Sequence, residues 1–314
     1  MARIVVLGAS GFLGSHLCDQ LIARGDEVVG IDNLSSSTGA NLKHLESNKR
    51  FSFVMNDISE GISVKGKIDA VLNFASPASP PRYLEMPIQT LRTGSQGTEN
   101  ALRLALENNA RFIMASTSEI YGDPSISPQV ETYWGNVNPI GERSCYDEAK
   151  RYAEALCMAY WREKNANIGI VRIFNTYGPR LDPDDGRVVS NFVCQAIEGN
   201  DLTIYGDGTQ TRSFCYVDDE IRGIIAMLDS DQRGPINIGN PVEFTMLELA
   251  ELVLELTSSK SSLVYRELPA DDPLQRKPDI SNAIEFLGWR PAIDLREGLE
   301  QTIKWFRGIV NVKK

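Results

Sequence analysis

Four residues in the middle of the chain have side chains suited to acid and base chemistry. Tyr146 and Lys150 are four positions apart, and Thr117 and Glu119 stand close together earlier in the sequence. Residues four apart share one face of a helix, so a helix here would place the Tyr146 phenol beside the Lys150 ammonium. A tyrosine alone titrates near ~10, and a neighbouring cation favours its phenolate. The pair is therefore a candidate general base, with the Thr117 hydroxyl and the Glu119 carboxylate near it.

The N-terminal segment has the pattern of a nucleotide-binding turn. Residues 4–7 form a short apolar run typical of a buried parallel strand, and Gly8, Gly11 and Gly14 follow it before a helical pattern begins. Glycines at this junction let backbone amides approach a pyrophosphate at a helix N-terminus. A second strand, residues 28–31, ends on Asp32, whose carboxylate would meet ribose hydroxyls and repel a 2'-phosphate. The pattern favours NAD over NADP.

The rest of the chain alternates apolar strands with helical stretches. Strands are predicted at residues 51–55, 70–74, 111–115 and 168–173, and helices at residues 90–107 and 146–164. This alternation predicts an α/β fold with a doubly wound parallel sheet, the Rossmann arrangement, and ligands at the carboxyl ends of its strands. A polar loop after residue 178 opens a smaller C-terminal substrate-binding α/β domain. We expect residues 1–178 and 213–239 in the NAD-binding domain and residues 179–212 and 240–314 in the smaller one.

Composition excludes several other classes. The net charge of −10 argues against a general nucleic-acid binder, and no apolar run approaches the length of a membrane span. A strand pattern begins within four residues of Met1 and leaves no room for a signal peptide, so a cytoplasmic location is expected. Five cysteines without a Cys-x-x-Cys pair and two histidines predict neither a metal site nor a disulfide framework.

The motifs resemble a known family. The spacing Gly-x-x-Gly-x-x-Gly together with Tyr-x-x-x-Lys resembles the extended short-chain dehydrogenase/reductase superfamily. Residues 131–150, 172–180, 184–192 and 271–280 resemble, more narrowly, the UDP-glucuronate decarboxylases, also called UDP-xylose synthases, and the resemblance covers nearly the whole chain. It implies NAD as cofactor, UDP-glucuronate as substrate, decarboxylation through a 4-keto intermediate, and a homodimer.

The resemblance also implies roles for individual residues. Asp57 would hold the adenine amino group, Arg212 and Arg276 would face the diphosphate or the sugar carboxylate, and Ser118 stands where related dehydratases carry an acid, which disfavours dehydration. The implied catalytic residues are Thr117, Ser118, Glu119, Tyr146 and Lys150. The implied cofactor contacts are Gly8, Gly11, Phe12, Leu13, Gly14, Asp32, Asn33, Asp57, Ile58, Phe74, Ala75, Ser76, Thr93, Tyr146 and Lys150. The implied substrate contacts are Tyr83, Arg92, Asn175, Arg187, Tyr205, Arg212 and Arg276.

Two stretches depart from the family pattern. Ser76 stands where relatives have Cys, which is a near-isosteric change. Arg92-Thr93-Gly94 stands where relatives have Lys-Thr-Asn. Arg92 has a larger cationic group than Lys, and Gly94 lacks the side-chain amide of Asn. The second departure bears on how the sugar or the diphosphate is held.

Three other functions stay open. A UDP-glucuronate 4-epimerase would also oxidise carbon 4 of the sugar. It has no need for the sequence motifs around Trp134 and Arg276. A decarboxylase that releases much of its UDP-4-keto-pentose would have nearly the same sequence. A catalytically silent NAD-sensing protein would be free to lose Thr117, Tyr146 or Lys150, and all three are present.

Overall fold

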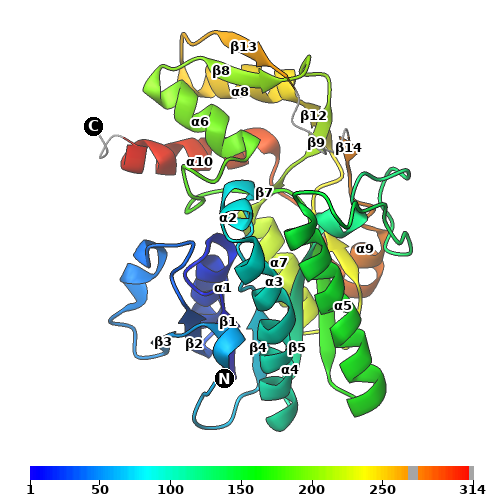
Figure 1. The fold of residues 1–314 in the computed structure, drawn as a ribbon. Helices are drawn as coiled ribbons and strands as arrows, with labels where there is room; N and C mark the ends of the chain where they lie inside the picture. The colour runs from blue at the N-terminus through cyan, green and yellow to red at the C-terminus, as the bar shows by residue number, and fades with distance from the viewer. Residues whose placement is uncertain (268–274, 311–314) are drawn as a thin grey trace.

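The computed structural model describes residues 1–267 and 275–310. Its larger part is built on a seven-stranded sheet in which all neighbouring strands are parallel, in the order β11-β6-β5-β4-β1-β2-β3 (Figure 1). The predicted doubly wound parallel sheet is confirmed. The strands are β1 (Arg3–Leu7), β2 (Glu27–Asp32), β3 (Phe51–Met55), β4 (Ala70–Asn73), β5 (Arg111–Thr117), β6 (Ile168–Ile173) and β11 (Ile236–Ile238).

Helices cover both faces of this sheet. Along β1, Ile4 and Val6 belong to the apolar core on one face, whereas Val5 and Leu7 belong to the core on the other. Burial of both faces explains why these strands are continuous apolar runs rather than alternating patterns. The helices of the two faces are α1 (Phe12–Ala23) and α7 (Val217–Leu228) on one side, and α4 (Thr98–Glu107) and α5 (Ser144–Lys164) on the other.

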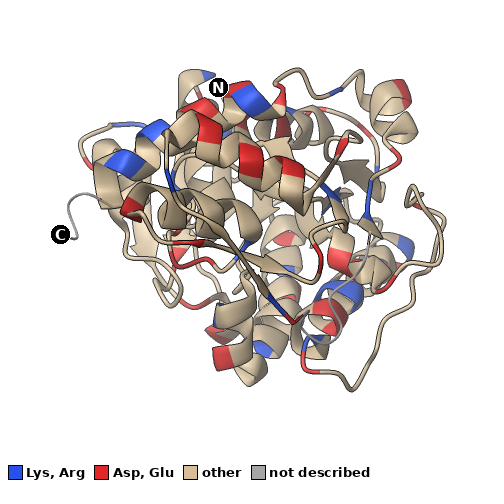
Figure 2. Cartoon of the chain, turned by 90° about the horizontal axis from the view of Figure 1, so that it is seen from above, with Lys and Arg blue, Asp and Glu red and all other residues tan. Residues whose placement is uncertain are grey.

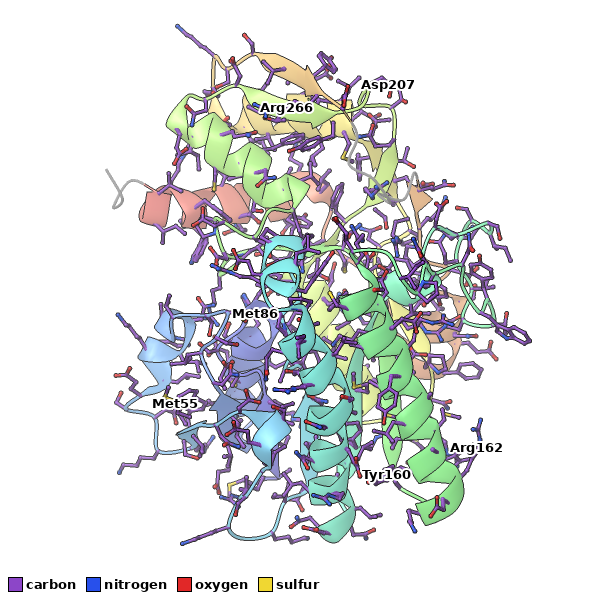
Figure 3. The ribbon with its side chains drawn as sticks, viewed as in Figure 1. Met55, Met86, Tyr160, Arg162, Asp207 and Arg266 are labelled. Atoms are coloured by element: carbon purple, nitrogen blue, oxygen red, sulfur yellow. The ribbon has the colours of Figure 1, made fainter. Side chains whose placement is uncertain are left out.

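A smaller group of elements lies beyond the carboxyl ends of the parallel strands, at the top of Figure 1. Figure 3 places Asp207 and Arg266 in this group, and Tyr160 and Arg162 at the far end of α5. β8 and β13 pair in parallel, β7 pairs with β10, and β12, β9 and β14 form a three-stranded sheet. The bounds are β7 (Thr176–Tyr177), α6 (Val188–Glu198), β8 (Leu202–Tyr205), β9 (Thr211–Ser213), β10 (Cys215–Tyr216), β12 (Glu243–Thr245), α8 (Met246–Thr257), β13 (Leu263–Arg266), β14 (Gln275–Arg276) and α10 (Leu295–Val310).

The chain returns to the large sheet before it ends. β11 pairs with β6, and α9 (Ser281–Leu287) packs against β11 and α7. The indole Nε1 of Trp289 donates a hydrogen bond to the Asp219 carbonyl at 2.9 Å and fixes the segment after α9. α9 therefore lies on the large sheet, although the sequence analysis assigned residues 240–314 to the smaller domain.

The helix predicted over residues 90–107 is interrupted. α3 (Pro87–Arg92) passes into a π-helical segment, η3 (Thr93–Gly97), before α4 begins, and Figure 3 labels Met86 at the junction of α3 with α2 (Pro80–Glu85). A Cβ atom at Gly94 would lie 2.6 Å from the Cβ of Ala149 on α5. Since Ala149 lies between Tyr146 and Lys150, this contact sets the distance between η3 and the candidate catalytic helix. No side chain fits at position 94, which is one of the two departures from the family pattern.

Charged residues of both signs occur throughout the molecule. In the cartoon of Figure 2, Lys and Arg residues are interspersed with Asp and Glu residues. Across residues 1–267 and 275–310, no helix has both the length and the apolarity to cross a membrane. Over the same ranges, no group of three His, Cys, Asp or Glu side chains could hold a metal ion.

Gly94→Ala should destabilise the fold, because the added methyl overpacks the contact with Ala149. Overpacking of this kind costs about 1–3 kcal/mol. Gly308→Ala is the matched control, since it lies in α10 with nothing within 4 Å of an added Cβ and should be neutral or stabilising by up to about 1 kcal/mol. Urea denaturation measures both variants. Equal stability of the Gly94→Ala variant and the parent would show that η3 does not depend on this contact.

Candidate active site

The predicted site residues gather where the parallel strands end. Thr117 ends β5, Asp32 ends β2, Gly8 follows β1, and Phe74 follows β4. β4 lies between β1 and β5 in the sheet, so these ends are neighbours. Ligands of open parallel sheets bind at this edge.

The glycine turn packs backbone against backbone. Gly8 has φ +77°, and a Cβ on it would lie 2.6 Å from the Phe74 carbonyl oxygen. A Cβ on Gly14 would collide with the Gly8 carbonyl oxygen. Phe12 and Leu13 begin α1, where the first amides have no acceptor within the helix. The turn therefore offers free amides and a close backbone surface to a pyrophosphate, as NAD requires.

Asp32 is positioned by the same turn. Its carboxylate accepts hydrogen bonds from the Ser10 amide at 2.9 Å and from the Leu34 amide at 2.8 Å. Burial raises the pKa of Asp32, and these two hydrogen bonds oppose the rise. The Ser10 hydroxyl is buried and has no hydrogen-bond partner among the described residues. The unsatisfied hydroxyl and the carboxylate fit a hydroxyl-bearing ligand such as the NAD ribose.

Asp57 is already engaged by protein groups. Its oxygens accept hydrogen bonds from the Ser59 amide and hydroxyl and from the side-chain amides of Asn33 and Gln89, at 2.7 to 2.9 Å. Burial acts to raise the pKa of Asp57, but the hydrogen bonds from Ser59 and Asn33 outweigh it and lower the pKa. A carboxylate has about four acceptor positions, so contact with an adenine amino group requires one of these donors to move. That role of Asp57 stays a prediction.

Tyr146, Lys150 and Thr117 meet between α5 and β5. The Lys150 ammonium donates a hydrogen bond to the Ala115 carbonyl at 2.9 Å and lies 5.7 Å from the centre of the Tyr146 ring. The side chains of Thr117 and Tyr146 are hydrogen-bonded to each other. All three residues are buried. The structure thus brings the predicted base, its cation and its hydroxyl partner together.

Burial is the largest influence on the pKa values of Tyr146 and Lys150. It raises the pKa of Tyr146 to about 12, although the hydrogen bond with Thr117 and the charge of Arg187 lower it. Burial also lowers the pKa of Lys150 to about 8. The expectation that the Lys150 ammonium favours the phenolate of Tyr146 stays a prediction.

Glu119 is held by two guanidinium groups. It lies in η4 (Ser118–Tyr121) and accepts hydrogen bonds from Arg143 at 2.6 Å and from Arg276 at 3.1 Å. Arg276, which is 2% exposed, also donates to the Ser118 carbonyl. Burial would raise the pKa of Glu119, but the charges of Arg276 and Arg143 lower it to about 2. Glu119 is therefore a fixed anion at neutral pH and cannot serve as an acid.

Tyr83 and Asp147 complete this cluster. The Tyr83 ring stacks on the Tyr146 ring with centroids 5.1 Å apart and an interplanar angle of 11°. The Tyr83 hydroxyl and the Oδ1 atom of Asp147 are buried without a hydrogen-bond partner among the described residues. Burial raises the pKa of Asp147 to about 7, and the negative charge of Glu119 adds to this rise. A second, readily protonated carboxyl group thus lies beside the candidate base.

Arg212 and Arg276 are neighbours on paired strands. Arg212 on β9 is in register with Arg276 on β14. Arg187 precedes α6, donates to the Ala78 carbonyl at 2.7 Å and acts by its charge on Tyr146. The three arginines proposed for an acidic substrate therefore lie at the same edge of the large sheet. Their individual contacts with substrate stay predictions.

The other predicted contacts lie on several different elements. Arg92 ends α3 as an exposed residue, so the enlarged head group noted in the sequence lies at the surface. Tyr205 on β8 is 41% exposed. Ile58 is buried beneath η3, where a Cβ on Gly97 would lie 2.7 Å from its Cδ1. The remaining predicted contacts are placed as follows: Thr93 buried in η3, Ala75 and Ser76 after β4, and Asn175 between β6 and β7.

Arg143 and Asp147 belong to the cluster around Tyr146 but were not predicted from the sequence. Both stand in the string of residues 131–150, but neither was given a role. Their spacing of four residues at the start of a helix was the available signal, because it places them on one face. The part of the other quoted string that spans residues 271–274 lies outside the described residues.

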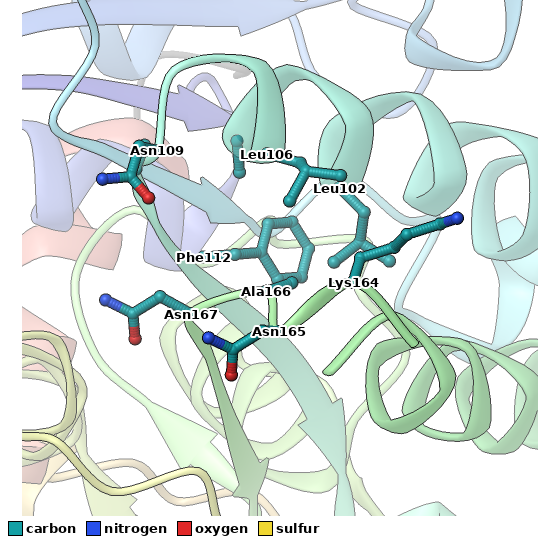
Figure 4. A pocket seen from close by; sticks show the side chains of 10 residues that line it. Leu102, Leu106, Asn109, Phe112, Lys164, Asn165, Ala166 and Asn167 are labelled. Carbon is teal, nitrogen blue, oxygen red and sulfur yellow. The ribbon is translucent and has the colours of Figure 1, made fainter. Parts of the chain in front are cut away.

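A separate cavity of about 160 Å³ lies at the opposite end of α5 (Figure 4). Leu102, Phe112 and Lys164 are among the residues around it. Tyr146 and Lys164 are separated by almost the full length of α5. The cavity is therefore distinct from the cluster around Tyr146.

Comparisons with known proteins agree with this site. The family model described as "NAD dependent epimerase/dehydratase family" matches residues 4–239. UDP-glucuronic acid decarboxylase 1 of Arabidopsis thaliana is 54% identical over 97% of this chain and 70% of that protein. UDP-glucuronic acid decarboxylase 1 of Xenopus tropicalis is 46% identical over 97% of this chain and 72% of that protein. The structure of UDP-glucuronic acid 4-epimerase from Bacillus cereus, in complex with UDP-glucuronic acid and NAD, is 31% identical with a TM-score of 0.85, over 98% of this chain and 99% of that one.

The resemblance stated from the motifs is confirmed by these matches. The glycine turn, the Asp32 carboxylate and the buried Tyr146 and Lys150 fit the NAD named in the family description. The chain is an enzyme of the NAD-dependent epimerase/dehydratase family and belongs, within it, to the UDP-glucuronic acid decarboxylases.

Proposed function

We propose that the chain decarboxylates UDP-glucuronate to UDP-xylose through a 4-keto intermediate. The observation that carries this proposal is the cluster in which Glu119 accepts from Arg143 and Arg276 beside the Thr117 and Tyr146 pair. The two guanidinium groups can recognise the carboxylate of a substrate. The negative charge of Glu119 opposes tight binding of that carboxylate. Similarity to decarboxylases named for UDP-glucuronic acid, at 46% and 54% identity, supports the same substrate.

The first half of the reaction is an oxidation at carbon 4 of the sugar. Tyr146 takes the proton of the 4-hydroxyl, and Thr117 hydrogen-bonds the same oxygen. NAD, when bound, would supply the hydride acceptor. Lys150, held at 2.9 Å by the Ala115 carbonyl, adds its own charge beneath the Tyr146 ring. The product of this half is a 4-ketone.

The second half breaks the bond to the carboxylate. Carbon 5 is now next to a ketone, so carbon dioxide can leave while its bonding electrons pass into an enolate. Thr117 and Tyr146 stabilise the negative oxygen of that enolate. Glu119 neutralises part of the charge of Arg143 and Arg276, which would otherwise stabilise the carboxylate before it leaves. Protonation of carbon 5 and return of the hydride give UDP-xylose.

Incubation with UDP-glucuronate and NAD tests this function. Mass and proton spectra should show UDP-xylose and loss of carbon dioxide. The 4-epimerase alternative predicts an isomer of unchanged mass, and a decarboxylase that releases its intermediate predicts UDP-4-keto-pentose. A protein that binds NAD without turnover would correspond to the sensing alternative and would contradict the proposal.

Tyr146→Phe should abolish oxidation of the sugar while NAD stays bound, because the variant removes the base and keeps the ring. General base catalysis contributes about 10²- to 10⁴-fold, so activity should fall at least 10²-fold. Tyr160→Phe, at a partly exposed position farther along the same helix, is the matched control and should keep full activity. UDP-xylose formation measures both. If the activity of Tyr146→Phe is within a few-fold of the parent's, Tyr146 is not the general base.

Glu119→Gln should stop the reaction after oxidation. The variant leaves Arg143 and Arg276 without a full counter-charge, so they stabilise the substrate carboxylate and slow its loss. We expect NADH absorbance to accumulate on addition of UDP-glucuronate, with no release of carbon dioxide. Retention of NAD and UDP binding is the control for folding. If no NADH forms although both ligands bind, Glu119 acts in oxidation or in substrate alignment instead.

We further propose a homodimer formed through α3 and α5, which lie side by side in Figure 1. Ile88 and Leu91 on α3 are 67% and 42% exposed, and Tyr152 on α5 is 48% exposed. These side chains form an apolar surface that a second copy would bury.

Apart from the second copy, the proposed partner is a UDP-sugar. We propose no nucleic-acid partner and no membrane partner. The cytoplasmic location expected from the sequence stays a prediction.

Ile88→Asp should convert the dimer to a monomer, because it places a charge in the proposed interface. Phe286→Asp on α9, at a comparably exposed apolar residue away from α3 and α5, is the control. Sedimentation should give the mass of two chains for the parent and the control, and of one chain for Ile88→Asp. One chain for the parent would refute the dimer.

A further inference from the structure

The proposed reaction gives no task to the second carboxyl group of the site. Asp147 follows Tyr146 on α5, is 7% exposed, and has one oxygen without a hydrogen-bond partner among the described residues. The ring of Tyr83 stacks on the ring of Tyr146. The Tyr83 hydroxyl is also buried without a hydrogen-bond partner among the described residues. Unsatisfied polar atoms inside a protein are uncommon and each needs an explanation. Two of them beside the candidate base indicate that polar chemistry takes place there.

The two carboxyl groups have opposite surroundings. Glu119 takes hydrogen bonds from both Arg143 and Arg276, and their charges hold its pKa at about 2. Burial raises the pKa of Asp147 to about 7, Glu119 and Glu148 add to the rise, and Arg143 and Arg276 oppose it. Carboxyl groups whose pKa values are driven apart in one site divide the roles of anion and acid.

The reaction requires a proton that neither Tyr146 nor Glu119 can provide. When carbon dioxide leaves, the electron pair of the broken bond enters the enolate, and carbon 5 must then gain a proton. The proton that Tyr146 takes from the 4-hydroxyl returns to the same oxygen when the ketone is reduced. Glu119 carries no proton at neutral pH, since both guanidinium groups hold it ionised. A separate acid is needed, and it must be recharged from solvent in each turnover.

We propose that Asp147 supplies the proton that carbon 5 gains after carbon dioxide has left, an inference that rests on the proposed function. A carbon–hydrogen bond forms at carbon 5, the enolate reverts to the 4-ketone, and Asp147 becomes a carboxylate. Arg143 and Arg276 then act on its charge, and water returns a proton to it before the next turnover. The groups that face Asp147 are Tyr83 from α2, Glu119 from η4, Arg276 from β14, and Arg143, Tyr146 and Glu148 from α5 and its start.

Asp147→Asn tests the proposal, with Glu148→Gln as the matched control. Asn has the shape of the neutral carboxyl group, so the variant should fold, and Glu148 is the adjacent carboxyl group on the same helix. On mixing with UDP-glucuronate, Asp147→Asn should release about one carbon dioxide per site, accumulate NADH and then stall. Steady formation of UDP-xylose should fall roughly 10²-fold or more, the usual contribution of an acid. Glu148→Gln should turn over like the parent well below pH 7, and its fall with pH should begin slightly lower, because one of the charges that raise the pKa of Asp147 is removed.

The outcomes separate this inference from the proposed function. If the parent itself releases no carbon dioxide, the proposed function fails. If the parent is a decarboxylase but Asp147→Asn turns over within about threefold of it, the acid is another group and the inference is wrong. If the variant binds both ligands but forms no NADH, Asp147 aligns the substrate for oxidation and the inference is also wrong.

The pH profile gives a readout that a merely structural role would not change. The folded pKa of Asp147, about 7, lies above the ordinary value of 3.8, so the group carries its proton below pH 7 and loses it as the pH rises through 7. Turnover by the parent should fall over that window. Asp147→Asn has no titrating group there, so its slow residual turnover should not show this fall. The same fall in the variant would overturn the inference.

Discussion

The ion cluster of Glu119, Arg143 and Arg276 is the interaction on which the site depends. It joins three segments: η4 at the end of β5, the start of α5, and β14 in the smaller group of strands. Arg276 is almost fully buried, so its charge has lost most of its water. Removing one partner of a buried ion pair costs about 3–5 kcal/mol, because the other charge is left uncompensated. The cluster therefore connects the smaller group of elements to the large sheet and fixes the charge of Glu119 at the same time.

Burial sets the chemistry of the remaining groups. It raises the pKa values of Tyr146 and Asp147 and lowers that of Lys150, so desolvation, rather than any single neighbour, is the largest influence on each. Desolvation disfavours the charged form, so it favours the protonated forms of Tyr146 and Asp147. Glu119 is the exception because two guanidinium groups outweigh its burial.

The sequence was most informative where chemistry follows from local spacing. The alternation of apolar runs and helical patterns predicted the parallel sheet, and the spacing of Tyr146 and Lys150 placed both on one helix. Spacing could not show that Arg143 and Arg276 share Glu119, because 133 positions separate the two arginines and only the folded chain brings them together. It could not show the π-helical segment at Gly94 either, because that depends on the approach of Ala149 from another helix. The effect of burial on the pKa of Tyr146 could not be predicted either, because periodicity carries no information on desolvation.

The central claim is that carbon 4 is oxidised and reduced within one turnover while carbon 5 loses its carboxylate. UDP-glucuronate carrying deuterium on carbon 4 tests it directly, because the transferred hydrogen should return to carbon 4. The account predicts UDP-xylose with deuterium retained at carbon 4 and a hydrogen from solvent at carbon 5. Loss of the carbon 4 deuterium to solvent, or recovery of a product that still contains its carboxylate, would contradict it.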